Sequence, residues 1–216
     1  MKKRYLFLFL LLCISIVVFT SSIFAEVPPL MVYIDPGHGG IDGGATIHNI
    51  KESTLTLSIS KKIKEVFEKN NITVLLTREE DVALSTNPFV KREDMLKRVN
   101  MMNSSTACLG LSIHLNKFSI ERYRGAQVFY STTNSNNALL AETMQKSLIQ
   151  NLKNTDRKIV KRDNIFLLNK VTLPCCVIEC GFMSNPEEFQ LLQTEDYQYK
   201  IAYALLYGVE DFLKLY

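Results

Sequence analysis

The sequence has 216 residues, of which 47% are apolar and 22% are charged, with nine glycines and six prolines. This composition excludes a disordered, collagenous or low-complexity chain and a disulfide-dense miniprotein. The overall charge of +3 comes from 25 basic and 22 acidic residues, and three of the basic residues lie within residues 1–25, which contain no acid. The rest of the chain therefore carries no net charge. Because a neutral body has no broad basic face, we expect no nucleic-acid partner.

Residues 1–25 have the pattern of an export segment. Lys2, Lys3 and Arg4 form a positive start, and Tyr5–Ala25 carry no charge. As a helix this uncharged stretch would span about 31 Å, close to the roughly 30 Å of a bilayer core, so a cleaved signal peptide and a signal anchor both fit. In either case the basic residues hold the N-terminus inside and place the body outside. We expect an exported chain, attached to a membrane through this segment, with one domain over residues 27–216.

Strand-like and helix-like stretches alternate after the export segment. In chain order the expected strands are 31–35, 72–77, 107–114, 126–130, 165–168 and 175–180. The expected helices are 52–70, 94–103, 137–152, 186–192 and 196–215. In the first helix Leu55, Ile59 and Ile63 follow the 3.6-residue period. The alternation predicts an α/β fold in a single domain, with a mostly parallel sheet covered by helices on both faces.

The cysteines outside the export segment favour free thiols over disulfides. They are Cys108, Cys175, Cys176 and Cys180. Their even number permits disulfides in an exported chain. Two of them are adjacent, however, and the other two lie in apolar, strand-like runs. We expect buried thiols that act as small hydrophobic side chains.

Three chemically active side chains occur where predicted strands end, and a fourth begins the first predicted helix. His38 follows the first strand by three residues, His114 closes a later strand, and Glu179 lies near the end of the last strand. Glu52 opens the first helix three residues before Leu55, which places it on the face toward the sheet. Ligands of parallel sheets bind beyond the carboxyl ends of the strands. We therefore expect two histidines and two glutamates to share one rim of the sheet.

Two imidazoles and one carboxylate with an open fourth position are a catalytic zinc pattern. A carboxylate at the position of Glu52 is costly to bury unless it is paired or bound to a metal. The third histidine, His48, lies in a polar loop and is expected to be solvated. The glycine-rich stretch 35–44 has neither a dinucleotide-binding nor a P-loop spacing, and no nucleophile elbow is present. Asp35 and Asp42 within it are expected to serve as turn residues or as partners of the ligands.

Four blocks of the sequence occur in a fixed order. They are Asp35-Pro36-Gly37-His38-Gly39-Gly40 with Asp42, then Glu52, then Ser112-Ile113-His114-Leu115-Asn116, and then Glu179-Cys180-Gly181-Phe182-Met183-Ser184-Asn185. In order and spacing these blocks resemble the zinc-dependent N-acetylmuramoyl-L-alanine amidases, from about Val32 to the C-terminus. The resemblance implies one zinc ion on His38, Glu52 and His114, Glu179 as the catalytic carboxylate, and a twisted sheet between helices. The implied reaction is hydrolysis of the amide between N-acetylmuramic acid and L-alanine in peptidoglycan.

Three details narrow the resemblance. Lys51 precedes Glu52, whereas the family's glutamate is usually followed by a lysine. Only residues 117–124 separate Asn116 from Gly125, which leaves no room for the autoinhibitory helix of some members, and we expect no wall-binding domain. A catalytic domain behind an N-terminal anchor is most similar to the sporulation amidases of spore-forming bacteria. The resemblance thus implies a role in spore cortex maturation through muramic-δ-lactam formation, hence in germination, on the outer face of a membrane around the forespore, with a lipoprotein or another sporulation protein as partner.

Substrate contacts are expected from three residues: Asn116, Arg78 and Arg98. Arg92 is a further candidate partner for carboxylates of the site or of the stem peptide. A basic cluster comprises Lys153, Arg157, Lys158, Lys161 and Arg162. This cluster is expected to be a solvated loop, with acidic wall polymer or a protein partner as the alternative.

Three other functions stay open at this point. A vegetative wall-remodelling amidase would use the same chemistry at another stage of growth. A non-catalytic module would keep the fold and bind peptidoglycan without cutting it. A metallopeptidase would cut within the stem peptide, and its products would differ, because only an amidase releases muramic acid free of peptide.

Overall fold

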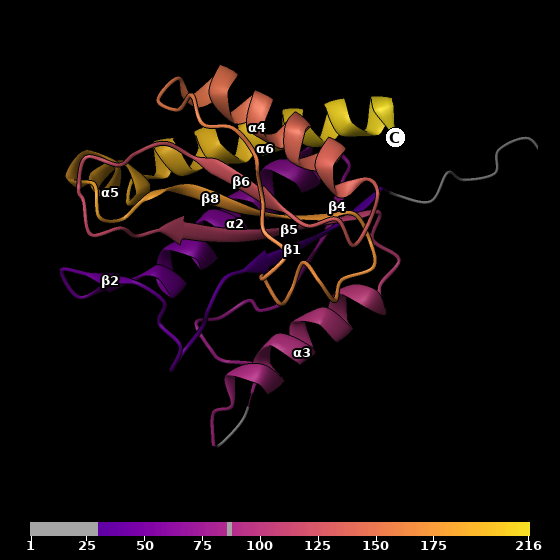
Figure 1. Ribbon diagram of the computed structural model, residues 1–216, viewed down its shortest axis with the longest axis horizontal. Helices are drawn as coiled ribbons and strands as arrows, with labels where there is room; N and C mark the ends of the chain where they lie inside the picture. Colours follow the sequence, from indigo (N-terminus) through magenta and orange to yellow (C-terminus); the bar gives the residue numbers. More distant parts are fainter. Residues whose placement is uncertain (1–29, 86–87) are drawn as a thin grey trace, which may run out of the picture.

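The computed structural model describes residues 30–85 and 88–216. Its centre is a six-stranded sheet in the order β4-β1-β5-β8-β6-β7 (Figure 1). The strands are β1 (Met31–Pro36), β4 (Thr73–Leu76), β5 (Leu109–Asn116), β6 (Gln127–Tyr130), β7 (Val160–Lys161) and β8 (Cys175–Phe182). Neighbouring strands are parallel except for β6, which runs antiparallel to β8. The prediction of a mostly parallel sheet is confirmed.

Helices cover both faces of this sheet. They are α2 (Glu52–Lys69), α3 (Lys91–Asn103), α4 (Asn137–Leu152), α5 (Pro186–Leu192) and α6 (Glu195–Leu215). Figure 1 shows α4 and α6 on one face of the sheet and α3 on the other. Helix α6 packs against both α2 and α4, so these three form one layer. The chain is therefore a single α/β domain, as the alternation of elements predicts.

Alternate side chains of the strands serve two hydrophobic cores. In β1, Val32 and Ile34 are completely buried in the larger core, which they share with residues of α2, α4 and α6. Tyr33, between them, belongs to a smaller core with Val99 and Met102 of α3. This period of two follows from the pleat of a strand. Because both faces are buried, the strands read as continuous apolar runs in the sequence.

The antiparallel pairing of β6 with β8 determines which residues meet at the functional edge of the six-stranded sheet. His114 of β5 is in register with Glu179 of β8, and Glu179 is in register with Gln127 of β6. Because β6 runs in the opposite direction, its first residue lies where β8 ends. These three side chains therefore form a row across one face of the sheet, at the edge where the parallel strands finish.

The two C-terminal helices begin at sequence signals for helix capping. The side chain of Asn185 accepts a hydrogen bond from the Glu188 N–H, and Pro186 occupies the first turn of α5. In the same way the Thr194 side chain accepts from the Tyr197 N–H at the start of α6. The predicted bounds of α5 are confirmed, and α6 begins one residue earlier than predicted.

The predicted strand at residues 165–168 is wrong. This segment forms consecutive turns, and the strand beside β6 is β7, a few residues earlier. Leu167 and Leu168 are nevertheless buried, because the turns place them in the smaller core. Their apolar character reflects burial and not strand pairing.

A short hairpin was also not predicted. Strands β2 (Thr46–Ile47) and β3 (Ile50–Lys51) pair antiparallel ahead of α2. The two residues between them, His48 and Asn49, have positive φ angles of 46° and 64°. Two consecutive positive φ values are typical of a type I′ hairpin turn.

The start of helix α3 also differs from the prediction. The helix begins at Lys91, three residues before the predicted start.

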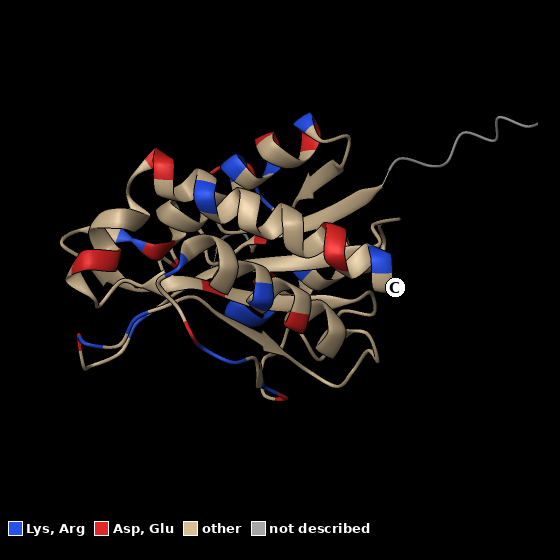
Figure 2. Ribbon diagram, turned by 90° about the horizontal axis from the view of Figure 1, so that it is seen from above, with Lys and Arg blue, Asp and Glu red and all other residues tan. Residues whose placement is uncertain are grey.

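Figure 2 shows basic and acidic residues mixed along the helices on the face that α4 and α6 cover. Within residues 30–85 and 88–216, no helix is both long and apolar enough to cross a membrane. The predicted export segment, residues 1–25, lies outside the described residues.

The four cysteines of the described chain are free, and Cys175, Cys176 and Cys180 are buried, as expected.

Candidate active site

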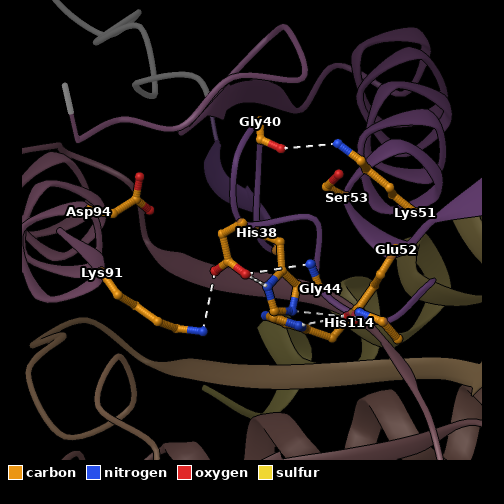
Figure 3. A network of polar contacts seen from close by, with 12 residues as sticks. His38, Gly40, Gly44, Lys51, Glu52, Ser53, Lys91, Asp94 and His114 are labelled. Carbon is orange, nitrogen blue, oxygen red and sulfur yellow. Dashed lines mark hydrogen bonds and ion pairs between the residues drawn. The ribbon is translucent and has the colours of Figure 1, made fainter. Parts of the chain in front are cut away.

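Three side chains from three elements meet at the carboxyl edge of the sheet (Figure 3). His38 lies in the loop after β1, Glu52 is the first residue of α2, and His114 lies near the end of β5. Glu52 Oε1 is 3.3 Å from His38 Nε2 and 3.1 Å from His114 Nδ1. One ligand atom from each residue lies within 4.8 Å of the other two. The structure thus brings together the three ligands proposed from the sequence.

Backbone amides hold the Glu52 carboxylate in a fixed orientation. Oε1 accepts from the Leu115 N–H at 3.1 Å, and Oε2 accepts from the Ala45 N–H at 2.9 Å. Although burial by itself raises the pKa of Glu52, its contacts with His114 and His38 outweigh burial and hold that pKa far below its ordinary value. Burial likewise tends to lower the pKa of His114, but the contact with Glu52 raises it. Glu52 is therefore an anion in this site.

Asp42 orients the other histidine. Its Oδ1 lies 3.1 Å from His38 Nδ1, and its Oδ2 lies 3.3 Å from Lys91 Nζ, as Figure 3 shows for the lysine. The contact at Nδ1 leaves His38 Nε2 directed at Glu52. A carboxylate on the second ring nitrogen fixes the tautomer and orientation of a ligating histidine. The expectation that Asp42 partners a ligand agrees with this geometry.

Two glycines of the motif provide room for the ligands. A Cβ at Gly37 would lie 2.4 Å from His114 Cε1, and one at Gly44 would lie 2.6 Å from Glu52 Oε2. Gly44 also has a φ of 66°, which side chains rarely adopt. The glycine-rich loop is therefore required by close approach to the ligands and not by phosphate binding.

A buried ion-pair network supports this loop from below. Arg98 of α3 is 1% exposed, and its guanidinium contacts Asp35 Oδ1 at 2.7 Å and Asp94 Oδ2 at 2.8 Å. It also donates to the carbonyl oxygens of Pro36 and His38. Burial alone would raise the pKa of Asp35, but Arg98 and hydrogen bonds from neighbouring hydroxyls hold it below its ordinary value.

Arg78 supports the same loop from another side. Its guanidinium donates to the carbonyl oxygens of Pro36, Gly37 and Ser53, so it ties the loop to the first turn of α2. Burial, with the nearby positive charge of Arg98, lowers the pKa of Arg78 to about 10. It remains charged at neutral pH.

The predicted substrate contacts through Arg78 and Arg98 are corrected by this geometry. Their side chains are 3% and 1% exposed, which leaves no surface for a stem peptide. Both instead position the loop that carries His38. Arg92, the other arginine considered, is exposed on α3. The i, i+4 spacing of Asp94 and Arg98 on a predicted helix is a signal in the sequence for an ion pair between them, but not for its burial.

Glu179 differs from Glu52 in its surroundings. Its Oε2 is buried and has no hydrogen-bond partner among the described residues. Burial raises the pKa of Glu179 to about 7; the nearby His114 opposes this rise, and the smaller effects of Glu52 and His38 raise and lower the pKa respectively. An unpaired buried carboxylate in register with His114 fits proton transfer better than a structural ion pair.

The donor set fits a divalent metal ion. Two imidazole nitrogens and one carboxylate oxygen converge with an open side, which is the ligand set of many catalytic zinc sites. The unpartnered Glu179 oxygen beside them has no structural explanation in the described chain without a ligand. Asn116, the remaining predicted contact, lies beyond the bulge that follows His114 and lines an adjacent groove.

A protein-family model described as N-acetylmuramoyl-L-alanine amidase matches residues 32–211. This chain belongs to that family. The germination-specific N-acetylmuramoyl-L-alanine amidase of Bacillus subtilis is 38% identical over 184 residues, which cover 83% of this chain and 78% of that protein. The family's activity is hydrolysis of peptidoglycan between muramic acid and L-alanine, and the chain is an amidase of this kind.

Solved structures of family members have the same fold. The CwlD amidase from Clostridioides difficile, in complex with the GerS lipoprotein, has a TM-score of 0.80 and 34% identity, over 87% of this chain and 100% of that one. An N-acetylmuramoyl-L-alanine amidase from Clostridium difficile 630 has a TM-score of 0.76 and 31% identity, over 86% and 97%. The family resemblance inferred from four short blocks is confirmed over residues 32–211.

Replacement of either histidine ligand should abolish metal binding. We expect the purified chain to hold one divalent metal ion, and His38→Ala or His114→Ala to lose it, because each removes one of three protein ligands. His48→Ala is a matched control, since His38 and His48 both have positive φ. Elemental analysis after dialysis measures the number of metal ions bound per chain. Full occupancy in both ligand variants would show that the ion binds elsewhere.

Loss of the buried arginine should destabilise the domain in a pH-dependent way. Arg98→Met leaves the buried Asp35 without its cation, which costs about 3–5 kcal/mol. The pKa of Asp35 is lowered in the native protein, so its contribution is present above the unfolded value of about 3.9 and is lost as pH falls through the lower folded value. The difference in unfolding free energy between the wild-type protein and Arg98→Met should therefore become smaller as the pH falls.

Urea unfolding of both proteins at pH 7 and at a pH below about 3.9, the unfolded pKa of an aspartate, measures this gap in unfolding free energy. Arg92→Met removes an exposed arginine from the same helix and should change stability by less than about 0.5 kcal/mol. A gap that is small at pH 7, or that widens toward acid, would contradict the role given to Arg98.

Proposed function

We propose that this amidase is a zinc enzyme of spore cortex maturation, with zinc on His38, Glu52 and His114 and with Glu179 as its catalytic carboxylate. The observation that carries the proposal is the unpartnered Glu179 oxygen beside three converging ligand atoms. The substrate is the amide between the lactyl group of N-acetylmuramic acid and the L-alanine of the stem peptide. The product is a muramic acid free of peptide, which is the species that lactam formation requires.

The chain's own residues have distinct tasks in this reaction. Zinc bound at the site supplies a Lewis acid that polarises the scissile carbonyl and lowers the pKa of water toward about 7. Glu179 accepts the proton of the attacking water and passes it to the leaving amine. Asp42 keeps His38 in its ligating tautomer, and the amides of Ala45 and Leu115 keep Glu52 oriented.

The proposed setting is the space around the forespore. The relatives that support it are a germination-specific amidase and a sporulation-specific N-acetylmuramoyl-L-alanine amidase of Bacillus subtilis, the second 30% identical. Residues 1–25 would export the chain and tether it to a membrane. We also propose a lipoprotein partner, by analogy with the CwlD amidase that was solved with GerS.

The carboxylate of Glu179 should be essential for turnover but not for folding. Glu179→Gln keeps the shape of the side chain and removes its ability to accept a proton, so activity should fall by about 10²–10⁴-fold with normal metal content. Release of free amine from purified peptidoglycan measures the rate. Glu142→Gln, an exposed glutamate on α4, is the control. Wild-type turnover by the Glu179 variant would assign proton transfer to another group.

The identity of the products separates the open alternatives. Mass spectrometry should find peptide-free muramic acid and intact stem peptides, because the cut lies at the lactyl amide. Cleavage inside the stem peptide would identify a metallopeptidase. Binding of peptidoglycan without any cleavage products would identify a non-catalytic binding module.

The spore cortex role has its own test. Deletion of the gene should give spores whose cortex lacks muramic-δ-lactam and that germinate poorly, since the lactam needs a peptide-free muramic acid. The wild-type gene should restore the lactam and the Glu179→Gln gene should not. Normal lactam content in the deletion strain would instead indicate a vegetative role with the same chemistry.

A further inference from the structure

A groove of about 320 Å³ lies next to the candidate active site. Its lining includes Asn116, Gln127, Phe129, Arg157, Arg162 and Phe182. Gln127 is the last member of the row that begins at His114 and passes through Glu179. Residues directly opposite one another on an antiparallel pair point to the same face. The groove therefore opens on the face of the sheet that carries the reacting groups.

Two arginines of the basic cluster lie over aromatic rings in this groove. The Arg157 guanidinium is 4.7 Å from the Phe182 ring centre, and that of Arg162 is 5.4 Å from the Phe129 ring centre. Arg157 also donates through Nε to the Arg124 carbonyl at 2.7 Å and through Nη1 to Gln127 Oε1 at 3.1 Å. A guanidinium has five N–H donors, so this arginine is held in place with donors to spare.

The positive charge of the groove is not neutralised by its own lining. Of the described side chains that line it, two are cationic and none is acidic. Asp163 pairs with Lys161 at 2.9 Å, and Glu187 pairs with Arg124 at 2.9 Å. The buried Glu188, whose charge also acts on Arg157, accepts hydrogen bonds from the Gly125 and Phe182 N–H groups and does not line the groove. The planar fork of arginine matches a carboxylate in geometry. The groove thus has the chemistry of a carboxylate site.

The distance from the reacting groups indicates which part of the substrate reaches the groove. Gln127 lies two strands from His114, which is about 10 Å at the usual strand spacing of about 4.7–4.9 Å. An extended peptide covers about 3.3–3.6 Å per residue. A carboxylate two or three residues beyond the scissile amide therefore reaches the arginines, whereas the L-alanine itself does not.

We propose that Arg157 and Arg162 form a subsite for a free carboxylate on the second or third residue of the stem peptide, and that this contact selects acidic over amidated stems. The proposal rests on the amidase function given above and assigns a specificity role to residues outside the metal centre. It also gives a function to a basic cluster whose sequence is equally typical of a solvated loop.

Three soluble glycan strands that differ only in their tripeptide stems test this subsite. One has free carboxylates on the second and third residues, one is amidated at the second, and one is amidated at the third. For the wild-type enzyme we expect at least one amidation to lower kcat/KM by roughly 10-fold or more, because a charge-assisted hydrogen bond is replaced by a neutral one. These strands carry no phosphate polymer, so the difference comes from the stem carboxylate alone.

Two variants connect this preference to the groove. Arg162→Gln changes an exposed side chain, and Arg157→Gln changes the half-buried one that donates to the Arg124 carbonyl and to Gln127 Oε1. Each should reduce the preference by slowing cleavage of the free acid while leaving the amidated stem within about twofold. A purely structural role would slow all three substrates alike. Lys158→Gln removes the same charge one residue from Arg157, on a side chain that does not line the groove, and should leave the preference unchanged.

The possible failures are distinguishable. Equal cleavage of all three strands by the wild-type enzyme would overturn the subsite and leave the amidase function intact. A preference that survives both arginine substitutions, or that Lys158→Gln also removes, would overturn the assignment to these residues. Failure of the metal-loaded enzyme to cut any strand would overturn the proposed function itself.

Discussion

The active site depends on one buried cation beneath the loop that follows β1. Arg98 lies between the carboxylates of Asp35 and Asp94 and also binds two carbonyl oxygens of the loop. Removing one partner of such a group leaves an uncompensated buried charge, so the arrangement tolerates few alternatives. Because the loop cannot shift without breaking this network, His38 is held at the edge of the sheet in a backbone conformation with a φ of 60° that few residues adopt.

Two glutamates at the same edge have opposite environments. Glu52 accepts hydrogen bonds from two backbone amides and lies within 3.3 Å of two imidazole nitrogens, and these contacts stabilise its charge. Glu179 has an oxygen that is buried without a partner, and its charged form is disfavoured. Pairs of titratable groups whose surroundings separate their pKa values are typical of acid–base assignments in enzymes. One fold edge thus provides both an anionic ligand and a group suited to carry a proton.

The reversal of β6 extends the functional edge beyond the metal ligands. In a fully parallel sheet, the strand beside β8 would begin at the opposite end, and Gln127 would lie far from Glu179. The antiparallel pairing of β6 with β8 instead brings the start of β6 and the basic segment before β7 beside the site. The faces of the sheet that helices cover form the hydrophobic cores and stabilise the fold. The edge of the sheet where β5 and β8 end is left for binding.

The sequence by itself determined the alternation of strands and helices and pointed to the candidate metal ligands, because both depend on local spacing. His38 and His114 follow or close strands, and Glu52 begins a helix. Only the tertiary structure decided what lies around them. Arg98 meets Asp35 across 63 positions of the chain, and no local pattern shows whether such an arginine is buried or solvated. The turn at 165–168 was mistaken for a strand for the same reason, since apolar side chains record burial and not the backbone hydrogen bonds that long-range packing selects.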